Sequence, residues 1–227
     1  MDRRHFAALA LTSLAMTAAA RPALAAKPGA EWDGLVKVKA KRFDKVYLRP
    51  GADFRGYTKV ILDPTEIAFE KNWRRDYNNN QRSTSLEVTD RDIQRMIEEG
   101  RKSAAEILQK AYTAGGYPVV TEPASDVLRV RTSLIDIIVR APDVMGPANV
   151  RTYSRDAGEI TLVVEARDSL TGSLLGRVVD DRTIDDFTME WRNRVTNRMD
   201  FDRQVESWAK NSVKGLNKLK TLSPIAG

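Results

Sequence analysis

The sequence predicts an α+β fold in which a mostly antiparallel sheet is covered on one face by two amphipathic helices. Three observations lead to this prediction. A helix with clear start and stop signals lies in the middle of the chain, apolar and polar residues alternate along segments on both sides of it, and a second helical pattern ends the chain. The resulting order of strand, strand, helix, four strands and helix is typical of the α+β class.

Two segments at the start of the domain are expected to form strands. Residues 44–50 (DKVYLRP) and 57–69 (YTKVILDPTEIAF) are rich in β-branched and aromatic residues, and a loop with two glycines joins them. Pro64 interrupts the second segment, so its latter half should lie at a sheet edge or carry a bulge, because proline cannot donate a ladder hydrogen bond. Residues 70–85 are polar without apolar periodicity, and we expect a loop there.

A helix is expected to begin at Thr89. Thr89 followed by Asp92 is a variant of the capping box, in which each residue satisfies a backbone N–H of the other. Gly115 and Gly116 should end the helix. The apolar positions that recur at helical spacing are Ile93, Ile97, Ala104, Leu108 and Ala111.

Residues 117–122 (YPVVTE) and 126–140 (DVLRVRTSLIDIIVR) are expected to be the next strands. The second segment alternates between an apolar and a more polar face, but Asp136 falls in line with the apolar set. Burying a carboxylate there would be costly without a partner, so Asp136 should mark a bulge or the end of the strand.

The segment EARDSLTGSLLGRVVDD looks rich in functional groups, and its pattern predicts a hairpin. Residues 158–168 alternate with one clean apolar side, and residues 173–181 form the return strand. Asp168 can accept backbone N–H groups of the turn, and Gly172 can adopt the left-handed conformation that closes it. After residues 187–200, which mix aromatic and basic residues, a last amphipathic helix should begin near Asp200.

The domain organisation follows from the two ends of the chain. Residues 1–25 have a basic start, an apolar Ala/Leu-rich run and an Ala-x-Ala site ending at Ala25, which is typical of an export signal. The pair Arg3–Arg4 resembles twin-arginine signals, and the sequence leaves general and twin-arginine export open. We expect a flexible lead-in over 26–42, a single α+β domain over 43–222, a tail over 223–227, no transmembrane segment, and a periplasmic location.

Two residue types are missing from the expected mature chain. The only histidine, His5, lies in the signal, and the sequence has no cysteine. This excludes Ser-His-Asp and Cys-His nucleophilic systems, most zinc, haem and iron–sulfur sites, and disulfides. We therefore expect no enzyme and no cofactor. The formal net charge of +6 indicates mild basicity, and no nucleic-acid partner is expected for an exported protein.

Aromatic and basic residues that adjoin one another form the best candidate binding surface. They are Trp73, Arg74, Trp191, Arg192 and Arg194. The alternatives are that Trp73 packs onto the sheet from a solvated loop, and that Trp191 belongs to a helical turn packed on the domain. Asp180, Asp181 and Asp185 are weaker candidates for a divalent cation, and pairing with nearby arginines is the expected role of these acids.

The segments VYLRPGADFRGYTKVILDPTEIAF and VVEARDSLTGSLLGRVVDD, together with the export signal, resemble a bacterial family of exported proteins and lipoproteins known as domain of unknown function 3313. The resemblance covers nearly all of the expected mature chain. It implies no activity and no catalytic residues. Many members carry a lipidated cysteine, which this sequence lacks, so no lipid anchor on cysteine is expected.

The expected function is that of a periplasmic, non-catalytic binding or accessory protein whose partner is an envelope protein or a glycan. Two alternatives remain open. A carboxylate-dependent glycan hydrolase would use a pair such as Asp136 and Glu165 about 5–10 Å apart in a cleft. A small-ligand carrier would need an apolar cavity of about 300–1,000 Å³ between sheet and helices.

Overall fold

The computed structural model describes residues 31–81, 84–140, 142, 152–192 and 194–226. Within these residues, eight strands form one sheet. All neighbouring strands pair antiparallel except β4 and β5, which both pair parallel with the same edge of β6. In sheet order, the strands are β1 (Glu31–Trp32), β2 (Leu35–Val38), β3 (Lys45–Leu48), β8 (Leu174–Arg192), β7 (Thr152–Asp168), β6 (Val127–Val139) and β4 (Lys59–Leu62), with β5 (Glu66–Phe69) beside β6.

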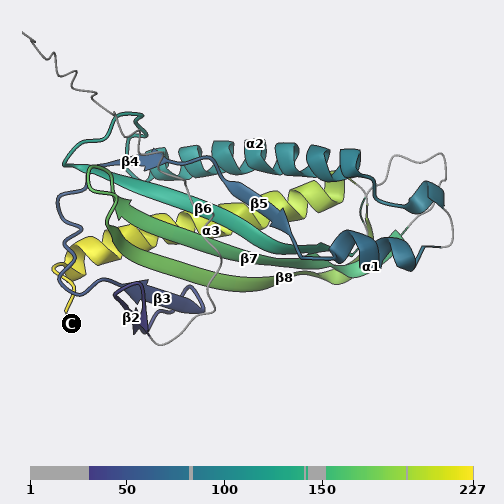
Figure 1. The fold of residues 1–227 in the computed structure, drawn as a ribbon, viewed down its shortest axis with the longest axis horizontal. Helices are drawn as coiled ribbons and strands as arrows, with labels where there is room; N and C mark the ends of the chain where they lie inside the picture. Colours follow the sequence, from purple (N-terminus) through teal and green to yellow (C-terminus); the bar gives the residue numbers. More distant parts are fainter. Residues whose placement is uncertain (1–30, 82–83, 141, 143–151, 193, 227) are drawn as a thin grey trace, which may run out of the picture.

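Two long helices, α2 (Asp90–Ala114) and α3 (Arg194–Leu222), lie on the same face of the sheet (Figure 1). A short helix, α1 (Trp73–Asn79), and a 3-10 turn (Thr84–Leu86) connect β5 to α2. The predicted fold class, an α+β domain with a mostly antiparallel sheet and two helices on one face, is confirmed.

The core lies between the sheet and these two helices. On β6, Leu128, Val130 and Leu134 are at most 2% exposed. They alternate with the more polar residues of the opposite face, as the pattern of a half-buried strand predicts. On the helices, Leu108 and Val213 belong to the same cluster of buried side chains as Leu128 and Val130.

Local signals in the sequence account for the start of α2. The Thr89 hydroxyl accepts from the Asp92 N–H at 3.2 Å, and the Thr89 N–H donates to the Asp92 carboxylate at 3.0 Å, which confirms the predicted capping box. The β7–β8 turn also forms as expected. Asp168 accepts from the N–H groups of Leu170 and Thr171 at 3.1 and 2.7 Å, and Gly172 has a φ of 70°.

Several element boundaries differ from the sequence expectation, and the predicted strand 57–69 is divided into β4 and β5. The predicted loop 70–85 contains α1, a helix too short to show an apolar period, whose only buried residue is Trp73. Residues 117–122 form only an isolated bridge from Val119 to Val60. Strand β8 continues to Arg192 and α3 begins at Arg194, because β8 pairs with β7 as far as Thr152, a partner that local sequence does not reveal.

The segment predicted as a flexible lead-in contributes to the sheet. Asp33 and Gly34, with φ values of 57° and 73°, form a two-residue turn between β1 and β2, and β2 pairs with β3. Leu35 is fully buried against Tyr47 and Leu174. The prediction of a flexible lead-in therefore differs from the structure over residues 31–38.

The predicted tail is also attached to the domain. Ile225 is 8% exposed and belongs to the core cluster. Its backbone exchanges hydrogen bonds with the segment before β4, since the Gly51 N–H donates to the Ile225 carbonyl and the Ile225 N–H donates to the Ala52 carbonyl. Residues 223–226 thus pack on the domain, and residue 227 lies outside the described residues.

Glu165 on β7 is held by two arginines on the face of the sheet opposite the helices. Arg177 donates to Oε1 from Nη2 at 2.6 Å and also reaches Asp33 at 3.0 Å, while Arg167 donates to Oε2 from Nε at 2.9 Å. Burial raises the pKa of Glu165, but these hydrogen bonds outweigh burial, and the pKa lies below its usual range.

This lowered pKa predicts a pH-dependent contribution to stability. A carboxyl whose folded pKa is depressed stabilises the fold above its unfolded pKa, about 4.3 for Glu, and the contribution is lost as the pH falls through the folded value. We expect Glu165→Gln to lower the free energy of unfolding at pH 7 and to have a smaller effect at pH 3, as measured by urea unfolding. An effect of equal size at both pH values would contradict this assignment.

Candidate functional site

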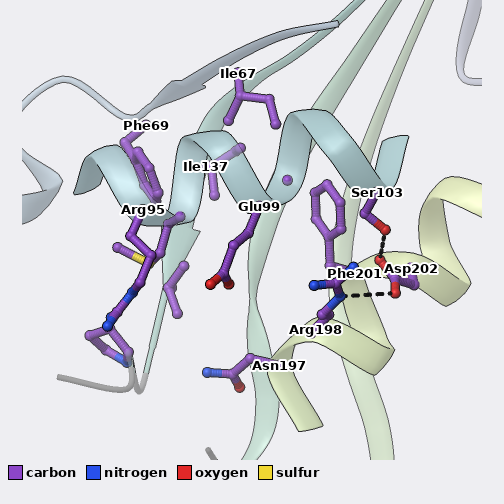
Figure 2. Close-up of a pocket in the computed structure, with 14 residues that line it drawn as sticks. Ile67, Phe69, Arg95, Glu99, Ser103, Ile137, Asn197, Arg198, Phe201 and Asp202 are labelled. Carbon is purple, nitrogen blue, oxygen red and sulfur yellow. Dashed lines mark hydrogen bonds and ion pairs between the residues drawn. The ribbon is translucent and has the colours of Figure 1, made fainter. Parts of the chain in front are cut away.

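A cavity of about 130 Å³ lies between α2, α3, β5 and the end of β6 (Figure 2). The elements meet at the end of the sheet where α2 and α3 begin and where α1 lies (Figure 1). Most of the wall is apolar, formed by Ile67, Phe69, Met96, Ile137, Val139 and Phe201. The pocket is thus mostly apolar, with polar and charged residues of α2 and α3 also in its lining.

The bulge at Asp136 shapes one wall of this pocket. Asp136 is exposed, has a φ of 51° and lies at the register shift between Ile135 and Ile138, so the predicted bulge is confirmed. Before the bulge, Leu134 faces the helices, and one extra residue changes the alternation so that Ile137 and Val139 face them afterwards. The bulge therefore places two apolar side chains in the pocket wall.

A glycine shapes the opposite wall. A Cβ at Gly100 on α2 would come within 2.7 Å of the Ile67 Cδ1 atom, so the Ile67 side chain would have to shift. Glycine at this position lets α2 approach β5 and leaves the Ile67 side chain in the pocket. Gly100 costs helix stability relative to alanine, so its presence is explained by packing rather than by helix propensity.

Trp73 packs against two residues of the pocket wall, Phe69 and Val139. Its ring stacks on Phe69 with centroids 4.8 Å apart, and its indole N–H donates to the Val139 carbonyl at 3.0 Å. With 5% of its surface exposed, Trp73 is not a surface contact, and of the two interpretations of its sequence the packed one is correct. Arg74 is exposed and pairs with Asp90 at the start of α2.

The other candidate binding residues lie at the same end of the fold. Trp191 and Arg192 are at the end of β8, where their backbones pair with Tyr153 and Thr152, and Arg194 is the first residue of α3. Their side chains lie outside the described residues, so their grouping as a surface stays a prediction. Residues of the first turns of α3 line the pocket, a position that their sequence did not indicate.

The charged residues at the rim differ in how they are paired. Arg95 pairs with Asp92 at 3.1 Å, and Arg198 pairs with Asp202 at 3.5 Å. Asp202 also accepts a hydrogen bond from Ser103. Glu99, in contrast, makes no hydrogen bond or ion pair with any residue in the described part of the chain, and Figure 2 shows its carboxylate directed into the space between α2 and α3.

The three aspartates considered for a cation do not share a site. Asp180 is fully buried beneath α3 and accepts from the Trp208 indole N–H at 2.7 Å, the Asp44 N–H at 2.9 Å and Arg182 at 2.8 Å. Asp181 is exposed, because successive residues of a strand point to opposite faces. The side chain of Asp185 lies outside the described residues. Over those residues, no three potential ligands form a metal cluster.

The pair proposed for a glycan hydrolase is also separated. Glu165 lies opposite Arg131 on β6. Asp136 is five residues further along the same strand, so its Cα lies roughly 16 Å from that of Arg131 at about 3.3 Å per residue, a separation that does not favour the shared cleft that glycoside hydrolysis requires. Glu165 is moreover engaged by Arg167 and Arg177.

The cavity is smaller than those that enclose whole ligands. At about 130 Å³ it is below the roughly 300 Å³ at which small-molecule pockets begin, and close to the 150 Å³ of an engineered apolar cavity that holds benzene. Such a volume accommodates one apolar side chain or ring.

A helix with the length and hydropathy of a membrane span does not occur among the described residues.

Three solved structures are similar to this chain at low sequence identity. The PelC dodecamer from Paraburkholderia phytofirmans is 13% identical, with 75% of this chain and 95% of that chain covered and a TM-score of 0.37. A candidate homologue of the neuraminyllactose-binding hemagglutinin from Helicobacter pylori is 12% identical, with 82% and 97% covered and a TM-score of 0.35. A candidate lipoprotein from Caulobacter crescentus CB15 is 14% identical, with 54% and 81% covered and a TM-score of 0.29.

No curated protein matches the chain. A family described as a protein of unknown function (DUF3313) matches residues 25–212, most of the sequence. This confirms the resemblance that the strand and hairpin segments indicate. The chain therefore belongs to the DUF3313 family.

Proposed function

We propose that this chain is an exported, non-catalytic binding or accessory protein of the bacterial cell envelope, and that it binds a protein partner at the pocket between α2 and α3. The observation that carries the proposal is the pocket itself, an apolar depression with a charged rim at the end of the fold. A periplasmic location is inferred from residues 1–25, which have the pattern of an export signal and lie outside the described residues.

The contacts of two carboxylates, Asp180 and Glu165, support the proposal that the protein binds a partner without catalysing a reaction. Asp180 and Glu165 are each held by arginines, and Asp180 also by an indole N–H. A general acid or base needs a reacting group within hydrogen-bond reach, and these two carboxylates face their own partners instead. The only histidine of the sequence, His5, lies within the proposed signal.

Filling the pocket should abolish partner binding without unfolding the protein. We propose comparing Met96→Trp, in the pocket wall, with Lys102→Trp on the exposed side of α2, each purified after cross-linking from the envelope of the producing bacterium. The partner is expected to co-purify with the wild type and with Lys102→Trp but not with Met96→Trp. Equal recovery with both variants would contradict the role of the pocket.

The location has a separate readout in the same preparation. Mass spectrometry of protein from the periplasmic fraction is expected to find an N-terminus near Ala26, as cleavage after Ala25 requires. Full-length protein that begins at Met1 and stays in the cytoplasm would contradict export, whatever the outcome of the binding experiment.

A further inference from the structure

The size and chemistry of the pocket identify the kind of group that it takes. Most of its wall is formed by aliphatic side chains, a methionine and two phenylalanines, with polar and charged residues of α2 and α3 beside them, and its volume matches a single ring or branched side chain. A sugar or nucleotide would leave polar groups unpaired against the apolar part of this wall, at a cost that apolar contacts do not offset. The group that enters the pocket is therefore apolar and small.

The charges at the rim determine what adjoins this apolar group. Both arginines that line the pocket, Arg95 and Arg198, already pair with aspartates. An anionic ligand would have to compete with these pairs. Glu99 is the lining carboxylate without a partner in the described part of the chain, so a cation beside the apolar group gains an ion pair without breaking one.

We propose that the pocket takes one apolar side chain of a protein partner, in a segment where a lysine or arginine adjoins that side chain, and that Glu99 binds the cation. This inference rests on the proposed function, because it names the chemistry of the partner at the same pocket. It assigns Glu99 a role in specificity, whereas the apolar wall provides the contact area. A buried anchor residue with a charged neighbour at the rim is a common arrangement in protein interfaces.

Glu99 and its neighbour on α2 allow a matched test of this role. Glu99 lines the pocket, whereas Glu98 is exposed and does not. Glu98 and Glu99 make no hydrogen bond or ion pair in the described part of the chain, and neither belongs to the apolar wall. Both lysine variants are therefore expected to fold. They carry the same change of net charge, and any difference between them reports the position of the charge.

The experiment is a titration of the isotope-labelled mature protein followed by NMR of the methyl groups of Ile67, Met96, Ile137 and Val139. The probes are two short synthetic peptides with blocked ends, one with phenylalanine beside arginine and one with phenylalanine beside glutamate. Octanoate serves as a third probe, an anionic amphiphile that represents a lipid. Unchanged spectra of the free variants verify that each is folded.

The basic peptide is expected to shift these methyl signals saturably. We expect the wild type and Glu98→Lys to bind the basic peptide about two- to fivefold more tightly than the acidic peptide, which is the effect of an exposed ion pair. Glu99→Lys should abolish or reverse this preference. The same preference in Glu99→Lys, no shift with either peptide, or tighter binding of octanoate than of the basic peptide would overturn the inference. If recovery of the partner in the cross-linking experiment still depended on Met96, the proposed function would remain supported although this inference had failed.

Discussion

Replacing Asp180 with alanine is expected to lower the free energy of unfolding by about 2–4 kcal/mol, measured by urea or thermal unfolding. Asp180 is fully buried and joins three parts of the fold: it accepts from Trp208 on α3, from the backbone of Asp44 and from Arg182 on β8. The alanine variant leaves the Trp208 indole N–H without an acceptor in the core and removes one hydrogen bond that joins α3 to the sheet.

The neighbouring residue provides the control. Asp181 has the same chemistry, lies one position along β8 and is exposed, with a distant pair to Lys45 at 3.8 Å. Asp181→Ala should change the unfolding free energy by no more than about 0.5 kcal/mol. Equal effects of the two substitutions would contradict the structural role assigned to Asp180.

Gly158→Ala is the second substitution with a large expected effect, a loss of at least about 3 kcal/mol of unfolding free energy. Gly158 on β7 has a φ of 148°, a conformation essentially restricted to glycine. A Cβ there would lie 1.8 Å from the Ile138 carbonyl oxygen, which is backbone and cannot rotate away. Alanine would therefore separate β7 from β6 beside Ile137 and Val139, in the pocket wall.

A second glycine predicts an effect of opposite sign. Gly215 lies in the interior of α3, and a Cβ there meets no atom within 4 Å. Gly215→Ala should raise the free energy of unfolding by about 0.5–1 kcal/mol, because alanine loses less conformational entropy in a helix. If both alanine variants destabilised the protein similarly, the backbone strain assigned to Gly158 would be wrong.

Elements that depend on local signals could be predicted from the sequence. The capping residues of α2, the turn at Asp168 and Gly172 and the bulge at Asp136 each result from the chemistry of a few adjoining residues. The two-residue turn at Asp33 and Gly34 carried the same kind of signal, since Asp-Gly between apolar residues favours a hairpin, but the surrounding lysines suggested a flexible segment.

The pocket could not be predicted, because its walls come together through distant contacts. Ile67 reaches the pocket through the parallel pairing of β5 with β6, and Phe201 comes from the other end of the chain. Neither pairing partner is visible in local periodicity. Trp73 was a candidate because it is an aromatic residue beside arginines. Glu99 is one of many charged residues on α2, and nothing in the sequence distinguishes it from the others.

Photocross-linking in living cells tests most directly whether the pocket is a binding site. A photoreactive benzoylphenylalanine would replace Met96 in the pocket wall or Lys102 on the exposed side of α2. Irradiation is expected to join the protein to a partner of defined mass from position 96 and not from position 102. The absence of any adduct from position 96, or the same adducts from both positions, would contradict the role of this pocket.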